Sequence, residues 1–360
     1  MTGTAENTGT ADTADHVGAA KADAAGRRPG ARARRARTAA VALLAATGLF
    51  VAGCTHQGKP RVPSDDGRGH LDTSAPSPSA PTSSKPARPA PSLLAVKIDN
   101  VRAARPQTGL DSADIVYAEQ VEGGLSRLMA VYATRLPKAV GPVRSARESD
   151  LELLRQFHDP TLAFSGAQGK LMPLINRAPL DARTPEKASE AYFRGAGRAI
   201  PHNLYLRPKR LMPTTPGPDA LTTGFRYGPA PAGGTKDTSE TVRFPAARFT
   251  FTWSASRGRW LVSLDGTPDV MTDGKRLAPA TVVVQYVKVR KSRFHDFLGN
   301  NTPYTVTTGS GKAKVLRDGR AWDVNWQRAK ATDGTRFTTE DGSPMNFAKG
   351  QVWVVFAKAS

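Results

Sequence analysis

Short apolar runs separated by Gly, Pro, Asp and Asn dominate the chain from residue 93 onward. Runs of this length, bounded by turn-forming residues, are typical of β-strands. In the first half they predict strands over residues 93–98, 115–121, 127–134 and 161–164. Gly123 and Gly124 suit a tight connection between the second and third of these strands, because glycine adopts positive φ at little cost.

A different pattern, polar residues followed by apolar ones at helical spacing, begins near residue 145. Two overlapping capping boxes, Ser145-x-x-Glu148 and Ser149-x-x-Glu152, precede an apolar face made by Leu151, Leu153, Leu154 and Phe157. A shorter helix is predicted over residues 168–176. Arg144 and Arg147 fall at or just before the start of the first helix, where free N–H groups and the helix dipole favour an anion.

Residues 213–239 are rich in Pro, Gly and Thr and indicate a linker. Beyond them, Trp322, Val324 and Trp326 alternate with polar residues, as in a half-buried strand. Strands are predicted over residues 242–253, 259–264, 281–289, 304–308, 312–316, 321–326 and 351–357. The expected fold class is α+β: an N-terminal mixed α/β domain over 92–212, a linker over 213–240, and a mostly antiparallel β C-terminal domain over 241–360.

The N-terminal region carries the pattern of an export signal. Arginines cluster between residues 32 and 37, an apolar run follows over 38–51, and Val51-Ala52-Gly53-Cys54 closes it. Fourteen helical residues reach only about 21 Å, short of the roughly 30 Å hydrocarbon core, so a signal peptide over 1–53 fits better than a spanning helix. The closing residues resemble a bacterial lipobox, in which Cys54 would receive lipid. The alternative is a buried core cysteine after a short apolar helix.

Cys54 is the only cysteine, which excludes a disulfide within the chain and a structural cysteine zinc site. Lipidation would place the protein on the outer face of the bacterial cytoplasmic membrane, with export by the general or the twin-arginine route left open. Residues 55–91 contain eight prolines and six serines with almost no large apolar side chain, so residues 54–91 are expected to form a disordered tether.

The formal net charge of +20 favours anionic partners. On the outer face of a membrane these are anionic lipids, an anionic cell-wall polymer or an envelope protein, and a nucleic-acid partner is not expected there. No dinucleotide, Walker or metal-ligand spacing is present, so neither a cofactor nor a metal is predicted.

The polar residues of the first half allow two kinds of site. Arginines can converge on an anionic ligand, since guanidinium groups suit phosphate and carboxylate; the candidates are Arg105, Arg127, Arg144, Arg147 and Arg198. Alternatively, Glu119 or Glu122 acts with His202 in a cell-envelope hydrolase. The structural alternative to both is that these arginines and carboxylates only form ion pairs with one another.

Several motifs occur together in a fixed order, among them Val121-Glu-Gly-Gly124, Gly141-Pro-Val-Arg-Ser-Ala-Arg147 and Pro201-His-Asn-Leu-Tyr205. With Val96-x-Ile-Asp-Asn100, Arg105-Pro-Gln-x-Gly-Leu110 and Ala113-Asp-Ile-Val-Tyr117, the chain resembles the YerB-like lipoproteins over about residues 93–360. The resemblance implies an N-terminal domain of unknown function followed by a β-rich domain, and it brings no established reaction. Its Pro-His-Asn motif adds Asn203 to the ligand-binding candidates.

Overall fold

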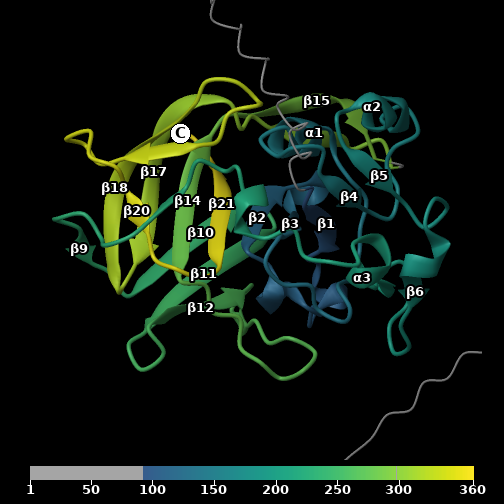
Figure 1. Cartoon of the computed structure of the whole chain (residues 1–360), viewed down its shortest axis with the longest axis horizontal. Helices are drawn as coiled ribbons and strands as arrows, with labels where there is room; N and C mark the ends of the chain where they lie inside the picture. Colours follow the sequence, from purple (N-terminus) through teal and green to yellow (C-terminus); the bar gives the residue numbers. More distant parts are fainter. Residues whose placement is uncertain (1–91, 297) are drawn as a thin grey trace, which may run out of the picture. The chain divides into compact units, whose positions relative to one another are not determined.

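An eleven-stranded sheet runs through the part of the chain that the structure describes, residues 92–296 and 298–360 of a computed structural model (Figure 1). The strand order along the sheet is β19-β18-β17-β14-β21-β2-β3-β1-β4-β5, and β9 pairs with β18 beside this path. The strands are β1 (Leu94–Asp99), β2 (Ile115–Gln120), β3 (Ser126–Tyr132), β4 (Thr161–Ala163), β5 (Asp181–Arg183), β9 (Thr235–Lys236), β14 (Thr281–Val287), β17 (Gly309–Arg317), β18 (Arg320–Arg328), β19 (Arg336–Thr338) and β21 (Val352–Lys358).

Strand β21 joins the two halves of this sheet. It pairs in parallel with β14 on one side and with β2 on the other, so that Val352 is the register partner of both Thr281 and Ile115. In Figure 1, β21 in yellow lies beside β2 in blue. The segments 92–212 and 241–360, predicted as separate domains, therefore share one sheet. The predicted linker also contributes strands, since β8 (Arg226–Tyr227) pairs with β20 (Asn346–Phe347) and β9 pairs with β18.

A second, four-stranded sheet covers one face of the large sheet. It has the order β10-β11-β12-β13, with β10 (Ser239–Phe244), β11 (Ala247–Ser254), β12 (Arg259–Leu264) and β13 (Thr267–Pro268). Phe249, Phe251 and Trp260 from this sheet share a core with Val96 and Trp353 of the large one. The region predicted as one strand over 242–253 is two strands, because Pro245 and Ala246 form the turn between β10 and β11.

The opposite face of the large sheet packs in part against α1 (Glu148–Leu154) and α2 (Met172–Arg177) of the first half. Leu153, Leu154 and Phe157 of α1 and the residues after it pack with Tyr117 and Val354 in a second core. The α-helices are α1 (Glu148–Leu154), α2 (Met172–Arg177) and α3 (Pro208–Leu211). Single 3-10 turns are η1 (Arg102–Ala104), η2 (Leu110–Ser112), η3 (Glu122–Gly124), η4 (Ser189–Ala191) and η5 (Pro218–Ala220).

Two further strand pairs complete the described chain: β15 (Val289–His295) with β16 (Asn301–Thr305), and β6 (Tyr192–Arg194) with β7 (Leu204–Leu206). The predicted β-rich second half is present. The first half is less helical than predicted, since its three α-helices have seven, six and four residues, and the described chain is mostly β. The parallel pairs of β21 depart from the expected antiparallel pattern.

None of the described helices is both long and apolar enough to cross a membrane. The predicted signal peptide, the lipidated Cys54 and the predicted tether lie outside the described residues.

Candidate functional site

Three charged residues form a row across the neighbouring strands β1, β3 and β2, near the same end of all three strands. Arg127 on β3 is the register partner of Asp99 on β1 and of Glu119 on β2. Cross-strand partners point to the same face of a sheet, so the three side chains are neighbours. All three are buried, with Asp99 1%, Glu119 4% and Arg127 9% exposed. Such a row is unfavourable unless each charge has a partner.

Glu119 finds its partner in Lys97, a residue that the sequence did not single out. The Lys97 ammonium donates to Glu119 and, at 2.7 Å, to Asp150 of α1, and the Ser149 hydroxyl donates to the second Glu119 oxygen at 2.7 Å. Burial alone would raise the pKa of Glu119, but Lys97 and the Ser149 hydroxyl hold it below its ordinary value. Burial, opposed by Lys97 and reinforced by the Glu119 charge, raises the pKa of Asp150 to about 6.

The start of α1 differs from the prediction. The helix begins at Glu148, its N-cap is Arg147, and the Asp150 carboxylate accepts the Arg147 backbone N–H at 2.7 Å. Neither predicted capping box forms, because Ser145 lies before the helix and Ser149 is committed to Glu119. A carboxylate of the chain itself, that of Asp150, therefore lies at the start of this short helix, where the helix dipole was predicted to favour an external anion.

Asp99 links two of the predicted site residues. His202 Nδ1 lies 2.8 Å and Arg144 Nε 3.1 Å from the same oxygen, Asp99 Oδ2. His202 reaches this position from the turn before β7, 103 residues away in sequence. The side chains of Arg144 and His202 are 24% and 23% exposed, so both reach solvent while Asp99 does not.

Glu122 and Arg147 form a second ion pair beside the first. Arg147 Nε and Nη2 donate to the two Glu122 oxygens at 2.7 and 2.6 Å, a bidentate pair, and the Thr302 hydroxyl of β16 also donates to Glu122. Burial opposes ionisation of Glu122, but Arg147 and Thr302 hold its pKa below the ordinary value. Glu122 can turn toward Arg147 because η3 follows β2 directly, with positive φ at Gly123 and Gly124.

Arg127 has no carboxylate partner among the described residues. Its one hydrogen bond there runs from Nη1 to the backbone oxygen of Ser145 at 3.0 Å, an oxygen that also accepts from Arg147 at 3.4 Å. Burial, together with the nearby charge of Arg147, lowers the pKa of Arg127 to about 9. Three guanidinium groups, those of Arg127, Arg144 and Arg147, thus share two carboxylates, and we refer to these three residues as the arginine cluster.

The other predicted binding residues lie apart from the arginine cluster. Arg105 donates to Asp265 at 2.8 Å and to the backbone of Asn100 at 2.6 Å. Asn203 accepts from Arg194 and donates to backbone oxygens of its own turn, so it shapes the loop that carries His202. Arg198 donates to the Tyr205 hydroxyl and to the backbone oxygen of Pro106.

The carboxylates predicted for catalysis are both engaged. Glu119 is buried against Lys97, Glu122 is paired with Arg147, and His202 contacts Asp99 and neither of them. Glu122, Ser145 and Arg147 line a pocket of about 400 Å³, together with Gln168 and Thr302 among others. Within the described ranges, no three His, Cys, Asp or Glu residues are grouped as a metal site would require.

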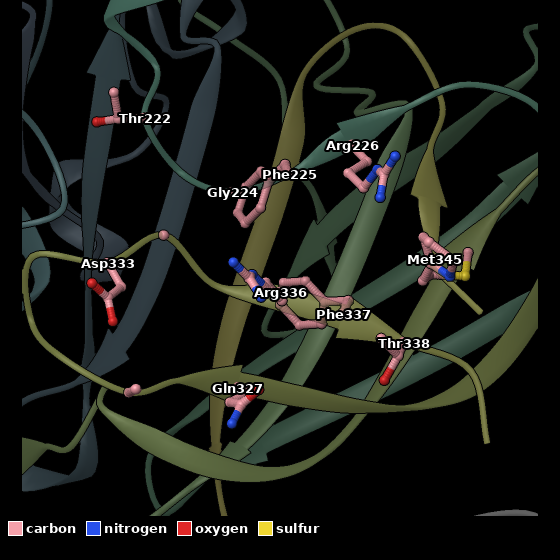
Figure 2. Close-up of a pocket in the computed structure, with 13 residues that line it drawn as sticks. Thr222, Gly224, Phe225, Arg226, Gln327, Asp333, Arg336, Phe337, Thr338 and Met345 are labelled. Carbon is pink, nitrogen blue, oxygen red and sulfur yellow. The ribbon is translucent and has the colours of Figure 1, made fainter. Parts of the chain in front are cut away.

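A larger pocket of about 700 Å³ lies at the far edge of the large sheet, between residues 222–226 and 327–345 (Figure 2). Figure 2 shows the side chains of Arg226 and Arg336 in it, with Phe225 and Phe337. Both arginines are exposed. None of the residues lining this pocket has a buried polar side-chain atom without a partner.

Sequence reasoning missed Lys97, Asp150 and Thr302. Lys97 carried a usable signal, because a lysine inside an otherwise apolar strand needs a buried counter-charge. Thr302 carried none, since it reaches Glu122 from a strand 180 residues away.

Comparisons with known proteins agree with this architecture. The chain is 24% identical over 277 residues to "Putative lipoprotein YerB" of Bacillus subtilis (strain 168), covering 72% of this chain and 80% of that protein. The crystal structure of YerB protein from Bacillus subtilis has the same fold, with a TM-score of 0.62 and 20% identity, over 75% of this chain and 91% of that one. The models of the DUF3048 N-terminal and C-terminal domains, described as protein of unknown function, match residues 77–219 and 240–354. The chain therefore belongs to the DUF3048 family.

Proposed function

We propose that the protein is a lipid-anchored binding protein of the cell envelope that captures an anionic polymer through the arginine cluster and His202. Its relative in Bacillus subtilis is named as a lipoprotein. The lipobox-like residues ending at Cys54 support the same anchoring here, at the outer face of the cytoplasmic membrane.

The observation that carries the proposal is that Arg127 is buried without an ion-pair partner among the described residues. A side chain 9% exposed keeps a guanidinium group that forms no ion pair with a carboxylate of the described chain. The charges of Arg147 and Arg144 lower the pKa of Arg127, and the nearby Glu122 and Asp99 only partly offset this effect and that of burial. A surplus positive charge held at low exposure is costly, and an anionic ligand would offset that cost.

The polymer is expected to carry phosphate or carboxylate groups. Guanidinium groups bind both in a bidentate manner, and Arg144 and His202 keep part of their surface open to solvent. The hydrolase alternative lacks this support, because Glu119 and Glu122 are both committed to cationic partners.

The test is retention of the purified full chain on immobilised polygalacturonate and on immobilised polyphosphate at low salt. We expect the double variant Arg144→Ala and Arg147→Ala to lose most retention on at least one of the two polymers. The matched control is Arg226→Ala with Arg336→Ala, which removes the same charge from exposed positions remote in sequence from the cluster. Equal loss in the two double variants would show non-specific attraction by net charge and would overturn the proposal.

Removal of Arg147 leaves Glu122 without its ion pair and can destabilise the fold. The single variant Arg144→Gln avoids this problem, because Arg144 is more exposed than Arg147. Circular dichroism of each variant checks that it is folded. Retention of folded Arg144→Gln at the wild-type level on both polymers would also count against the proposal.

A further inference from the structure

A third pocket, of about 410 Å³, lies between the first and second halves of the chain and shares no lining residue with the arginine cluster. It is lined by Arg102, Arg105 and Pro106 from the first half and by Leu264, Thr267, Pro268, Asp269 and Val270 from the second. Its volume falls in the range of small-molecule sites. Its walls combine apolar side chains with a few charged groups, which is the usual composition of such sites.

Asp269 is the central polar group of this pocket. Its side chain is 4% exposed, it accepts no hydrogen bond within the described chain, and its Oδ2 is fully buried without a partner. The backbone on both sides of it is fixed, because its N–H donates to Val262 and its carbonyl accepts from Leu277. A buried carboxylate held in place without a hydrogen bond is costly, and each such group calls for an explanation.

Neither neighbouring arginine donates to the Asp269 side chain in the part of the chain that the structure describes. Arg276 donates to the backbone oxygens of Val262 and Asp269 and to the Ser263 hydroxyl. Arg105 uses its two terminal nitrogens on Asp265 and Asn100, and its buried Nε has no partner. The pocket thus holds a buried acceptor and a buried donor that do not satisfy each other.

Arg102 supplies a free positive charge at the same pocket. It is exposed and makes no ion pair or side-chain hydrogen bond within the described chain. Pro106, Leu264, Pro268 and Val270 provide the apolar walls. A ligand that matched all these features would present a hydrogen-bond donor to Asp269, an anionic group to the arginines and a small apolar side chain to the walls.

From the unpaired Asp269 carboxylate, the free Arg102 and the apolar walls, we propose that this pocket binds a small zwitterion of the α-amino-acid type. Its ammonium contacts Asp269, its carboxylate contacts Arg102, and its apolar side chain lies against Leu264 and Val270. An ammonium also satisfies the Asp269 oxygens with charge-assisted hydrogen bonds, which are stronger than neutral ones.

The test uses the purified full chain and three matched probes, L-leucine, leucinamide and N-acetyl-leucine, followed by calorimetry and by methyl NMR of Leu264 and Val270. Leucinamide lacks the carboxylate and N-acetyl-leucine lacks the ammonium. We expect L-leucine to bind and to shift these methyl signals, and each of the other two to bind at least about tenfold more weakly. Alanine, valine, methionine and phenylalanine extend the series, and absence of binding by all five amino acids at millimolar concentration would overturn the proposal.

Two variants separate this pocket from any other site. Asp269→Asn keeps the shape of the side chain and is expected to abolish binding, whereas Asp323→Asn, on the exposed face of β18, is expected to bind as the wild type does. Arg102→Gln is expected to reduce the affinity for L-leucine and to leave that for leucinamide unchanged. Full binding by Asp269→Asn, or leucine-induced shifts that leave the Leu264 and Val270 methyl signals unmoved, would overturn the proposal.

Discussion

Lys97 and Asp150 lie 53 residues apart in sequence, yet the Lys97 ammonium donates to Asp150 Oδ1 at 2.7 Å in a place where neither side chain is exposed. The same ammonium pairs with Glu119. This contact fixes α1 to β1 and β2 just below the surface that carries the arginine cluster. Lys97, Glu119 and Asp150 thus form a second, buried group of charges next to the arginine cluster.

We predict that Lys97→Met destabilises the protein by about 3–5 kcal/mol, because it leaves the Glu119 carboxylate buried without its counter-charge. Urea unfolding at neutral pH measures the change. Lys275→Met is the control, since Lys275 pairs with Asp273 on the surface. An equally small effect of both substitutions would contradict the stabilising role assigned to Lys97.

Removal of a competing carboxylate should strengthen binding at the arginine cluster. In Asp99→Asn the side chain keeps its size but no longer neutralises Arg144. We expect this variant to be retained more strongly on the polymer that the wild type binds, with a difference that shrinks as salt is added. Asp265→Asn is the control: it removes one negative charge beside Arg105, the same change in net charge, and should leave retention unchanged. Weaker retention by Asp99→Asn would contradict the prediction.

Asp269 should impose a pH dependence on stability. Burial, only partly offset by Arg105 and Arg276, raises its pKa from 3.8 to about 7. The folded state therefore holds a proton that the unfolded state has lost, and the stability contributed by this group falls as the pH rises from about 4 to about 7.

Asp269→Asn removes this titration. Relative to the wild type, the variant should gain stability with rising pH, by up to about 4 kcal/mol between about pH 4 and about pH 8. Guanidinium unfolding at several pH values measures the difference in stability between the two proteins. The titration of Asp150 is common to both and largely cancels in this difference. Asp323→Asn is the control, and a constant difference for Asp269→Asn across this range would refute the prediction.

Gly123 and Gly124 provide a matched pair for the turn between β2 and β3. Both have positive φ, 66° and 71°. A Cβ on Gly123 would meet nothing closer than 3.9 Å, whereas one on Gly124 would lie 2.6 Å from Pro245 Cβ. We expect Gly123→Ala to cost about 1–2 kcal/mol from backbone strain alone, and Gly124→Ala to cost about 1–3 kcal/mol more. Thermal unfolding measures both, and equal costs would show that the contact with Pro245 is loose.

Local pattern predicted some elements well and the site only in part. The boundaries of β12, residues 259–264, follow from its alternating residues and the Asp265-Gly266 turn. The buried face of β18, with Trp322, Val324 and Trp326, also follows from alternation. The turn at Pro245 was missed, although a proline within an apparent strand argues against a continuous one.

The row formed by Asp99, Arg127 and Glu119 could not be predicted from the local sequence pattern. Its geometry depends on the register by which Arg127 faces both Asp99 and Glu119, and register is set by pairing between distant segments. The start of α1 could be predicted to within a few residues, but its N-cap could not. The Ser149 hydroxyl does not cap the helix because it donates to Glu119 on β2. Tertiary contacts thus decided which of several polar residues served each role.

The central place of β21 has a consequence for how the molecule is made. A chain that emerges N-terminus first, from a ribosome or an export channel, presents β2 and β14 as two open edges until residues 352–358 follow. During that interval each edge is available to any other extended segment nearby. Assembly is therefore timed by the arrival of the final strand, and a chaperone that shields these two edges would act at the step where misassembly is easiest.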